Sequence, residues 1–510
     1  MRGCEPPAPV QRPAIRDRVG GNNAGATGGS GWKRILDNTR SDEGKLPLAP
    51  SVRGGRLAAA PLVEGPIGRT LVLFSLPILA SNVLQSLNTS INAAWIGHLL
   101  GTRALTASAN ANALLFFLLS ISFGLGMAAT ILIGQSLGAR DLAQAKRVMG
   151  TCSLFFTGLS VAIAVAGFLI APHILHAMQT PPDAEPLAVA YLRIIFIGIP
   201  PIFLLAFMMM ALRGAGDSRT PFYFMLLCAV LDVGLNPLLI RGAGPIPAMG
   251  IAGSAVATSI AQWVSLIGLI FWLYWRRSIL CIRTGELKYF RIDLVILRSL
   301  MTKGIPMGLQ VVVISTSMIL MISLVDHFGS LTVAAYGACF QLWSYIQMPA
   351  FAVGSAVSSM AAQNVGANRW DRVSRITGAG VVYVTLLTGA LVAAVTLSDN
   401  AAYSLFLGGN AEAIAIAKHM HLIVSWSFIF WGIAFVFSSV VRATGAVIPP
   451  LVILTVAIWG VRLPAALLLS HTGVDGILWG FPAGSITSVI LIVLYYRFGN
   501  WRSAKMLVQH

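Results

Sequence analysis

Asp232 is the one carboxylate that lies deep inside a long apolar run of this sequence. A charged side chain at the centre of a membrane helix costs about 2.5–3.5 kcal/mol on insertion scales, so such residues usually carry a function. Asn236 follows one helical turn later and shares the same helix face, while Pro237 lacks a backbone donor and leaves a carbonyl free. These residues predict a polar notch in a membrane helix, and Asp232 is the first functional candidate.

A polar stripe runs along the first apolar segment. Ser81, Gln85, Asn88 and Asn92 recur at spacings of four, three and four residues, which places them on one helix face. Amides that face lipid would lack hydrogen-bond partners, so the stripe must face protein or water. Two interpretations stay open for Asn88 and Asn92: they line a cavity near Asp232, or they only form hydrogen bonds between helices.

Further side chains are candidates for contact with a transported compound. Flexible and aromatic groups accommodate varied ligands, although most such residues in so apolar a chain pack against helices or lipid. The candidates for a substrate cavity are Gln85, Gln310, Gln341, Tyr345 and Met209. Prolines inside the apolar runs predict helix bends at Pro77, Pro237 and Pro306.

Patterns for a metal site or a known catalytic centre are missing from the sequence. The five cysteines are scattered and predict free thiols, and the eight histidines lack further ligands for a metal. The His-Glu-x-x-His and Gly-x-x-x-x-Gly-Lys-Ser/Thr motifs do not occur. The pattern Gly-x-Ser-x-Gly occurs at residues 134–138, but at the end of a predicted helix and not at the strand-to-helix turn that a nucleophile elbow requires. We therefore expect no enzyme, no metal, no cofactor and no use of ATP, which leaves a cation gradient as the energy source.

The elements that must position these residues are membrane helices. The 510 residues are 56% hydrophobic and 10% charged, with a mean hydropathy of +0.78, whereas soluble proteins carry about 25% charged residues. The net charge of +17 comes from Lys and Arg in loops and in the tail, which fits the positive-inside rule better than nucleic-acid binding. We expect an all-α polytopic protein with about twelve spans. Their cores lie near residues 71–96, 104–134, 148–178, 188–212, 221–240, 250–273, 304–325, 332–362, 376–398, 414–441, 448–469 and 477–496.

Composition divides the chain into five predicted segments. They are a disordered basic tail (1–65), an N-terminal six-helix lobe (66–275), a cytoplasmic connector (276–303), a C-terminal six-helix lobe (304–498) and a C-terminal tail (499–510). The N-terminal tail lacks the apolar core of a signal peptide, and an over-extended gene start explains it equally well. Its positive charge predicts that both termini are cytoplasmic.

An internal repeat relates the two lobes. Residues 134–140 (Gly-Gln-Ser-Leu-Gly-Ala-Arg) match residues 362–368 (Ala-Gln-Asn-Val-Gly-Ala-Asn) at an offset of 228. At an offset of 229, Pro77 matches Pro306, and residues 213–216 (Arg-Gly-Ala-Gly) match residues 442–445 (Arg-Ala-Thr-Gly), so Arg213 corresponds to Arg442. Two like halves place a cavity at their interface, where rocking of one half against the other gives alternating access. This repeat predicts a transporter.

Several motifs then follow one another in a fixed order. They are Pro77, Asn-Ala-Ala-Trp-Ile-Gly-His-Leu at 92–99, Gly-Gln-Ser-Leu-Gly-Ala at 134–139, Arg-Gly-Ala-Gly-Asp-Ser-Arg-Thr-Pro at 213–221 and Leu-Asn-Pro at 235–237. In this order and with a second copy, they resemble the multidrug and toxic compound extrusion (MATE) family over about residues 65 to 500. The resemblance implies a monomeric inner-membrane antiporter with twelve helices. It implies export of organic, often cationic compounds in exchange for protons or sodium ions.

The sequence departs from that family at one position. An acidic residue is common in the family where this chain has Asn92, so the resemblance leaves Asp232 as the cation-coupling site. Asn236, Asn92 and Asn88 are then its neutral oxygen donors. A desolvated carboxylate suits a proton, and one carboxylate with several neutral oxygens suits sodium. Both coupling ions, H+ and Na+, stay open.

Alternatives to this reading concern the acid, the cargo and the class of protein. Asp232 could only lock its lobe by hydrogen bonds. A lipid-linked saccharide flippase of the same superfamily would share the architecture. We expect such a flippase to carry more cationic residues in its cavity, whereas the apolar runs of this chain contain few Lys or Arg. A membrane-embedded enzyme would need a convergent acid, base or nucleophile set. We expect Arg213 and Arg442 at the membrane interface.

Overall fold

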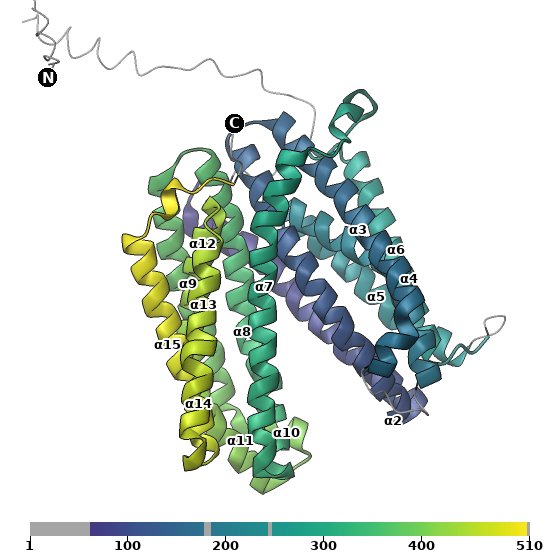
Figure 1. The fold of residues 1–510 in the computed structure, drawn as a ribbon, viewed down its shortest axis with the longest axis vertical. Helices are drawn as coiled ribbons and strands as arrows, with labels where there is room; N and C mark the ends of the chain where they lie inside the picture. The colour runs from purple at the N-terminus through teal and green to yellow at the C-terminus, as the bar shows by residue number, and fades with distance from the viewer. Residues whose placement is uncertain (1–61, 178–184, 243–246, 507–510) are drawn as a thin grey trace, which may run out of the picture. The chain divides into compact units, whose positions relative to one another are not determined.

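The computed structural model describes residues 62–177, 185–242 and 247–506. The predicted N-terminal tail lies outside these residues up to residue 61, as do the last four residues of the chain. Every regular element in the described ranges is a helix, and eleven of these helices are long and apolar enough to cross a membrane. The prediction of an all-helical membrane protein is confirmed (Figure 1).

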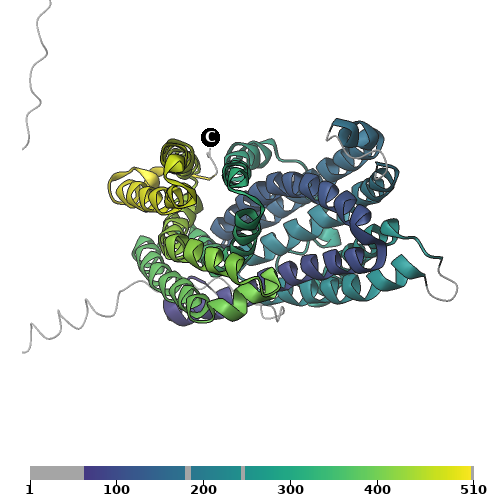
Figure 2. The same ribbon diagram turned by 90° about the horizontal axis from the view of Figure 1, so that it is seen from below.

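The N-terminal lobe contains five long helices. They are α2 (Ile67–Gly138), α3 (Leu142–Ala177), α4 (Glu185–Gly214), α5 (Arg219–Arg241) and α6 (Ile251–Trp275). α2 holds the first two predicted spans, which meet at Gly101. The backbone there has φ of 81°, a conformation that favours glycine, so the chain changes direction without a loop. α3, α4, α5 and α6 pack beside one another (Figures 1 and 2).

The C-terminal lobe follows the 3₁₀ turn η1 (Thr284–Tyr289). Its elements are α7 (Leu294–Val325), η2 (Asp326–Phe328), α8 (Ser330–Gly366), α9 (Trp370–Leu397), α10 (Asp399–Leu407), α11 (Ala411–Val424), α12 (Ser427–Thr444), α13 (Ile448–Thr455), η3 (Val456–Arg462), α14 (Leu463–Leu469), η4 (Ser470–Thr472), α15 (Val474–Phe498) and η5 (Trp501–Ser503). The segment η3 is a π-helix that joins α13 to α14, so these three elements form the eleventh predicted span. α12 packs against α9 and α15.

The span boundaries differ from the sequence prediction in three places. The predicted connector, residues 276–303, includes the beginning of α7, which starts at Leu294. The tenth predicted span is divided between α11 and α12, which are separated at Ser425 and Trp426. The eighth predicted span is α8, which is long enough to cross a membrane. It is less apolar than the eleven candidate spans, because it carries polar side chains such as Gln341 and Gln347.

A reciprocal pair of hydrogen bonds joins the two lobes. Gln135 on α2 donates from Nε2 to the carbonyl of Ala443 at 2.7 Å. Gln363 on α8 donates from Nε2 to the carbonyl of Gly214 at 2.9 Å. The two glutamines occupy matching positions of the repeat, and so do the two carbonyls. We call this pair of bonds the glutamine lock.

Two glycines let the helices approach closely at the glutamine lock. A Cβ atom on Gly138 would lie 1.9 Å from the carbonyl oxygen of Gln363, and one on Gly366 would lie 2.0 Å from that of Gln135. Both distances are far below van der Waals contact, so any side chain at either position would separate α2 from α8. The glycines of the repeated motif therefore hold the lobes together at this end.

Candidate functional site

Helix α5 carries Asp232 into the interior of the N-terminal lobe. Asp232 is 1% exposed and Asn236 is 0% exposed. The two residues lie one turn apart on the buried face of the helix, as the four-residue spacing predicts. Pro237 lies inside the same helix, which continues to Arg241. The polar notch is therefore a feature of an otherwise apolar helix.

Four side-chain donors surround the Asp232 carboxylate. Oδ2 accepts hydrogen bonds from Nδ2 of Asn88 and of Asn92, both at 2.7 Å. Oδ1 accepts from Oγ1 of Thr258 at 2.9 Å and from Nδ2 of Asn236 at 3.0 Å. An ionised carboxylate has about four acceptor positions, and here all of them are used. The arrangement satisfies a charged, unprotonated Asp232.

The donors come from three helices and form one network. Asn88 and Asn92 lie on the first span of α2, Asn236 on α5 and Thr258 on α6. Nδ2 of Asn236, whose two hydrogens are shared among three acceptors, also lies 3.0 Å from Oδ1 of Asn92 and 2.9 Å from the backbone carbonyl oxygen of Asp232. Two buried amide oxygens, Oδ1 of Asn88 and Oδ1 of Asn236, lack a hydrogen-bond partner. We call these five residues the Asp232 cluster.

The Asp232 cluster contains no ion pair in the part of the chain that the structure describes. The salt bridges there join Lys146 to Glu286, Lys418 to Asp399 and His419 to Asp475. The buried negative charge is thus held by neutral dipoles alone. Such a carboxylate is available to a mobile cation, because no fixed cation competes for it.

Sequence reasoning brought together four of the five cluster residues and missed Thr258. A single threonine inside the sixth apolar run gives no periodic signal, since threonines in membrane helices often bond to their own backbone. Only the placement of α6 against α5 shows that its hydroxyl donates to Asp232.

The predicted cavity residues do not join the Asp232 cluster. Gln310 is 6% exposed, and its Oε1 accepts from Arg442 at 2.6 Å. Gln341 and Tyr345 bond to each other on α8 at 3.2 Å. Of the other two predicted cavity residues, Met209 is buried in α4 and Gln85 is exposed on α2. Their role as a substrate cavity stays a prediction.

The three predicted bends fall inside helices. Pro77 lies in α2, Pro237 in α5 and Pro306 in α7. The carbonyl of Pro77 accepts a hydrogen bond from the hydroxyl of Ser81 at 2.8 Å, which assigns Ser81 to local bonding within α2. Whether these helices bend during a transport cycle stays a prediction.

Two arginines of the C-terminal lobe are buried within the helix bundle. Arg442, expected at the interface, is 3% exposed and also donates to Oγ of Ser439 at 3.0 Å. Arg462, inside the eleventh span, is 7% exposed. Arg442 lies in the last turn of α12, at the end where the interface is expected, whereas Arg462 places a cationic charge inside a span, where few were expected.

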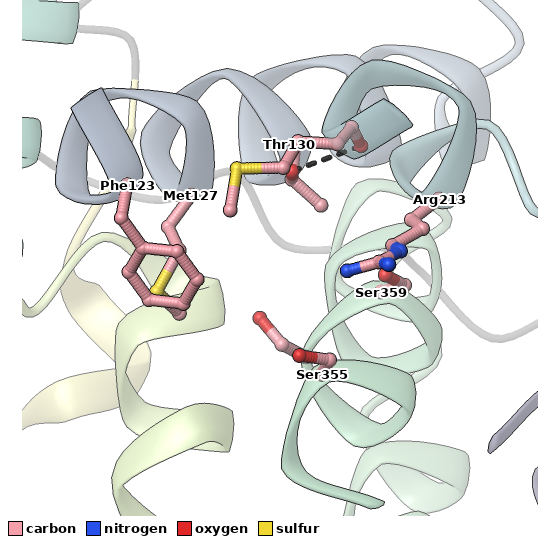
Figure 3. A pocket seen from close by; sticks show the side chains of 8 residues that line it. Phe123, Met127, Thr130, Arg213, Ser355 and Ser359 are labelled. Atoms are coloured by element: carbon pink, nitrogen blue, oxygen red, sulfur yellow. Dashed lines mark hydrogen bonds between the residues drawn. The ribbon is translucent and has the colours of Figure 1, made fainter. Parts of the chain in front are cut away.

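Arg213 borders a small pocket between the lobes (Figure 3). The pocket has room for about 20 Å³, enough for roughly one water molecule. Its lining residues come from α2, α4 and α8 and are Phe123, Met127, Thr130, Met210, Arg213, Ser355, Ser358 and Ser359. Nε of Arg213 and the hydroxyls of Ser358 and Ser359 are buried without hydrogen-bond partners.

Comparison with known proteins places the chain in a family. The sequence model of the MatE family matches residues 77–238 and again residues 306–468, so the two matches begin at Pro77 and Pro306, the pair that the repeat aligns. The probable multidrug resistance protein YoeA of Bacillus subtilis (strain 168) is 37% identical over 435 residues, which cover 85% of this chain and 94% of that protein. The chain belongs to the MATE family of efflux transporters. The resemblance predicted from sequence is confirmed.

Other MATE relatives agree in sequence and fold. The probable multidrug resistance protein YpnP of Bacillus subtilis (strain 168) is 32% identical over 454 residues, covering 89% of this chain and all of that protein. The fold matches a structure described as the outward-facing conformation of a multidrug resistance MATE family transporter. That match has a TM-score of 0.80 at 20% identity and covers 87% of this chain and 98% of the other. As a MATE protein, the chain is a transporter and not an enzyme.

Proposed function

We propose that this MATE protein is a secondary antiporter that exports organic, often cationic compounds in exchange for a cation bound at Asp232. The observation that carries the proposal is the Asp232 cluster, in which a buried carboxylate has four neutral donors and no fixed counter-ion. An ionisable group inside a membrane protein marks an ion pathway by default. The names of YoeA and YpnP, both probable multidrug resistance proteins, support the choice of cargo.

Proton binding would reorganise the Asp232 cluster. A protonated carboxyl must donate at one oxygen, where the ionised form accepts from two donors, so at least one donor has to turn away. The unpartnered Oδ1 atoms of Asn88 and Asn236 are acceptors that rotation of an amide would bring to that proton. Because Asn88 lies on α2 and Asp232 on α5, the proton changes how the first span is held against the fifth.

Sodium requires a larger rearrangement than a proton. A sodium ion needs several oxygen atoms directed at it, by analogy with other hard cations. In the Asp232 cluster the carboxylate faces three N–H groups and one hydroxyl. Several amides would have to turn before sodium could bind, whereas one is enough for a proton. The geometry therefore favours H+ over Na+ as the coupling ion.

The glutamine lock fits one end state of alternating access. The connector and the end of the chain lie at the same end as the lock, since Lys146 at the start of α3 bonds to Glu286 and Ser299 bonds to Met506. The positive-inside rule assigns this end to the cytoplasm of a bacterial inner membrane, with both termini inside. The lobes are then closed toward the cytoplasm, and rocking that separates them at the lock would open the other state. We propose that one monomer performs the whole cycle.

The test is export from proteoliposomes under separately imposed proton and sodium gradients. The probe is rhodamine 6G, an organic cation. We expect export under the proton gradient and a loss of about tenfold or more in Asp232→Asn, because the amide cannot bind a proton with the same affinity. Glu286→Gln, which removes a carboxylate outside the membrane spans, is the matched control and retains export.

Two results would contradict this assignment. Export driven only by sodium would replace the proton by sodium at the same site. Wild-type export by Asp232→Asn under both gradients would reduce Asp232 to a structural residue of the lobe.

A further inference from the structure

Arg462 is a buried guanidinium inside the C-terminal lobe. It ends the π-helix η3, within the eleventh span, and is 7% exposed. Its Cζ lies 3.6 Å from the centre of the Phe481 ring, and one terminal nitrogen lies 3.7 Å from Sδ of Met318. Its Nε lacks a hydrogen-bond partner. A ring face and a thioether are weak partners, so they do not compensate the burial of a full charge.

The surroundings of Arg462 are rich in donors and poor in acceptors. Oη of Tyr336 and Nε1 of Trp343 are also buried without partners. The ring of Tyr336 contacts that of Trp343, with the ring centres 5.7 Å apart. The ring of Trp343 in turn lies 5.5 Å from that of Phe481. None of the ion pairs of the described residues includes Arg462.

The backbone around Arg462 is adapted to its side chain. A π-helical segment is rare and frequently marks a functional site. On the facing helix α15, a Cβ on Gly484 would lie 2.9 Å from Cβ of Arg462, and one on Gly480 would lie 2.7 Å from its carbonyl oxygen. Both contacts are too short for a real Cβ. The two glycines therefore make the room in which Arg462 lies against α15.

The repeat relates Arg462 to the Asp232 cluster. In the register set by Pro77 and Pro306, Arg462 corresponds to Val233, the neighbour of Asp232. A π-helical turn holds one residue more than an α-helical turn, which brings Arg462 level with Asp232. Its partner Met318 lies on the first span of the second lobe, as Asn88 does in the first. The two lobes thus carry opposite charges at equivalent places.

We propose that Arg462 forms a second binding site of the transporter, which takes a carboxylate or phosphate group of the transported compound. This inference rests on the proposed function and extends it to cargo that carries a negative group. A guanidinium presents donors in a planar fork that matches both anions. The unpartnered Nε of Arg462 and Oη of Tyr336 are the further donors that such a group can use. The site therefore has a positive charge and free hydrogen-bond donors, and the anionic group of the cargo would supply the acceptor.

Binding of two fluorescent probes to the purified protein tests the proposal. Carboxyfluorescein carries carboxylates, and rhodamine 6G is cationic. We expect Arg462→Gln to weaken carboxyfluorescein binding by about tenfold or more, and to leave rhodamine 6G binding within about twofold. Arg462→Lys should retain most of the affinity, because the charge remains. Arg497→Gln removes an exposed arginine at the end of α15 and is the matched control.

Competition identifies the source of the anionic group. If inorganic phosphate displaces carboxyfluorescein from the wild type but not from Arg462→Gln, Arg462 binds the anion itself. Export of carboxyfluorescein from proteoliposomes, lost in the same variant, assigns the group to the cargo. Should Arg462→Gln fail to fold, Arg462→Met fills the space with an apolar chain and provides the same comparison.

Two outcomes would overturn the proposal. One is a folded Arg462→Gln or Arg462→Met that binds carboxyfluorescein as the wild type does. The other is a wild type that binds neither carboxyfluorescein nor phosphate. Failure of rhodamine 6G export under both ion gradients would instead refute the proposed antiport, and it would leave the Arg462 binding result standing.

Discussion

The two lobes treat a buried charge in opposite ways. In the N-terminal lobe, Asp232 has four hydrogen bonds at 2.7–3.0 Å. In the C-terminal lobe, Arg462 has one ring face and one thioether. The glutamine lock, by contrast, is the same from both sides. The repeat has kept the contacts that join the lobes, while the interior of each lobe has acquired its own chemistry.

The repeated arginines near the lock show the same divergence. Arg442 donates to Gln310 and to Ser439. In the repeat register, Ser81 and Met210 stand at the equivalent places near Arg213, and the hydroxyl of Ser81 is already bonded to Pro77. Nε lacks a hydrogen-bond partner in both arginines, so the difference lies in the two bonds that the terminal nitrogens of Arg442 make, whereas Arg213 borders the pocket. Matching positions in the sequence do not guarantee matching partners.

The largest effect should come from exchanging each buried charge for an apolar side chain. Asp232→Leu strands four donors and should destabilise the protein by about 3–5 kcal/mol. Arg462→Met removes an uncompensated charge and should be neutral or stabilising by about 1–4 kcal/mol. Thermal unfolding of the purified variants in one detergent measures both. Equal losses would show that Arg462 is as well satisfied as Asp232, and the contrast between the lobes would fail.

Sequence alone predicted most of the acidic site. A lone carboxylate in an apolar run is conspicuous, the spacing of Asn236 fixes its helix face, and the spacing of Asn88 and Asn92 does the same on another helix. Each of these signals is local to one helix. Thr258 was missed because its only signal is the packing of α6 on α5, which no single-helix pattern contains.

The basic site could not be predicted in the same way. Arg462 lies inside an apolar run, and its long side chain can either extend toward the interface or turn into the helix bundle, which the sequence does not distinguish. The π-helix changes the face on which it emerges, and periodicity assumes a regular helix. Gln310 was predicted to line a cavity because it is polar within an apolar run, and its bond to Arg442, far along the chain, could not be read from that pattern. Hydropathy and the repeat were enough to predict the fold class. They could not predict the division of α11 from α12, because the apolar run continues across it.

A smaller effect should follow from removing one donor to Asp232. Thr258→Val keeps the shape and deletes one hydrogen bond to the charged group, so we expect a loss of about 1.5–3 kcal/mol. Thr258→Ser restores the hydroxyl and should recover most of it. In the same measurement, Thr388→Val in the C-terminal lobe removes a buried hydroxyl without a partner and should cost less. If Thr258→Val is no worse than Thr388→Val, the four donors do not act as a set.

The glutamine lock offers a symmetric test. Gln135→Leu and Gln363→Leu each delete one bond between the lobes, and each should weaken closure by about 1 kcal/mol, or about fivefold. The readout is the rate at which a maleimide labels a cysteine placed at the interface by Ser355→Cys. Asn400→Leu, at an exposed position on α10 and away from the lock, is the control. A strong effect of only one glutamine would mean that the lobes are not held reciprocally.

The smallest effect concerns an ion pair that, among the described residues, only the N-terminal lobe makes with the connector. Nζ of Lys146 lies 2.5 Å from Glu286, whereas Ser374 stands at the matching position of the second lobe. The hydrogen bond from Lys146 lowers the pKa of Glu286 below its ordinary value. The stabilisation is therefore complete above the ordinary pKa of about 4.3, and it is lost as the pH falls through the lowered pKa of the folded state. Such a pair contributes below about 1 kcal/mol.

The difference in melting temperature between wild type and Glu286→Gln should stay constant from about pH 7 to pH 5 and vanish on further acidification. A difference that persists in acid would assign the effect of Glu286 to packing and not to its charge.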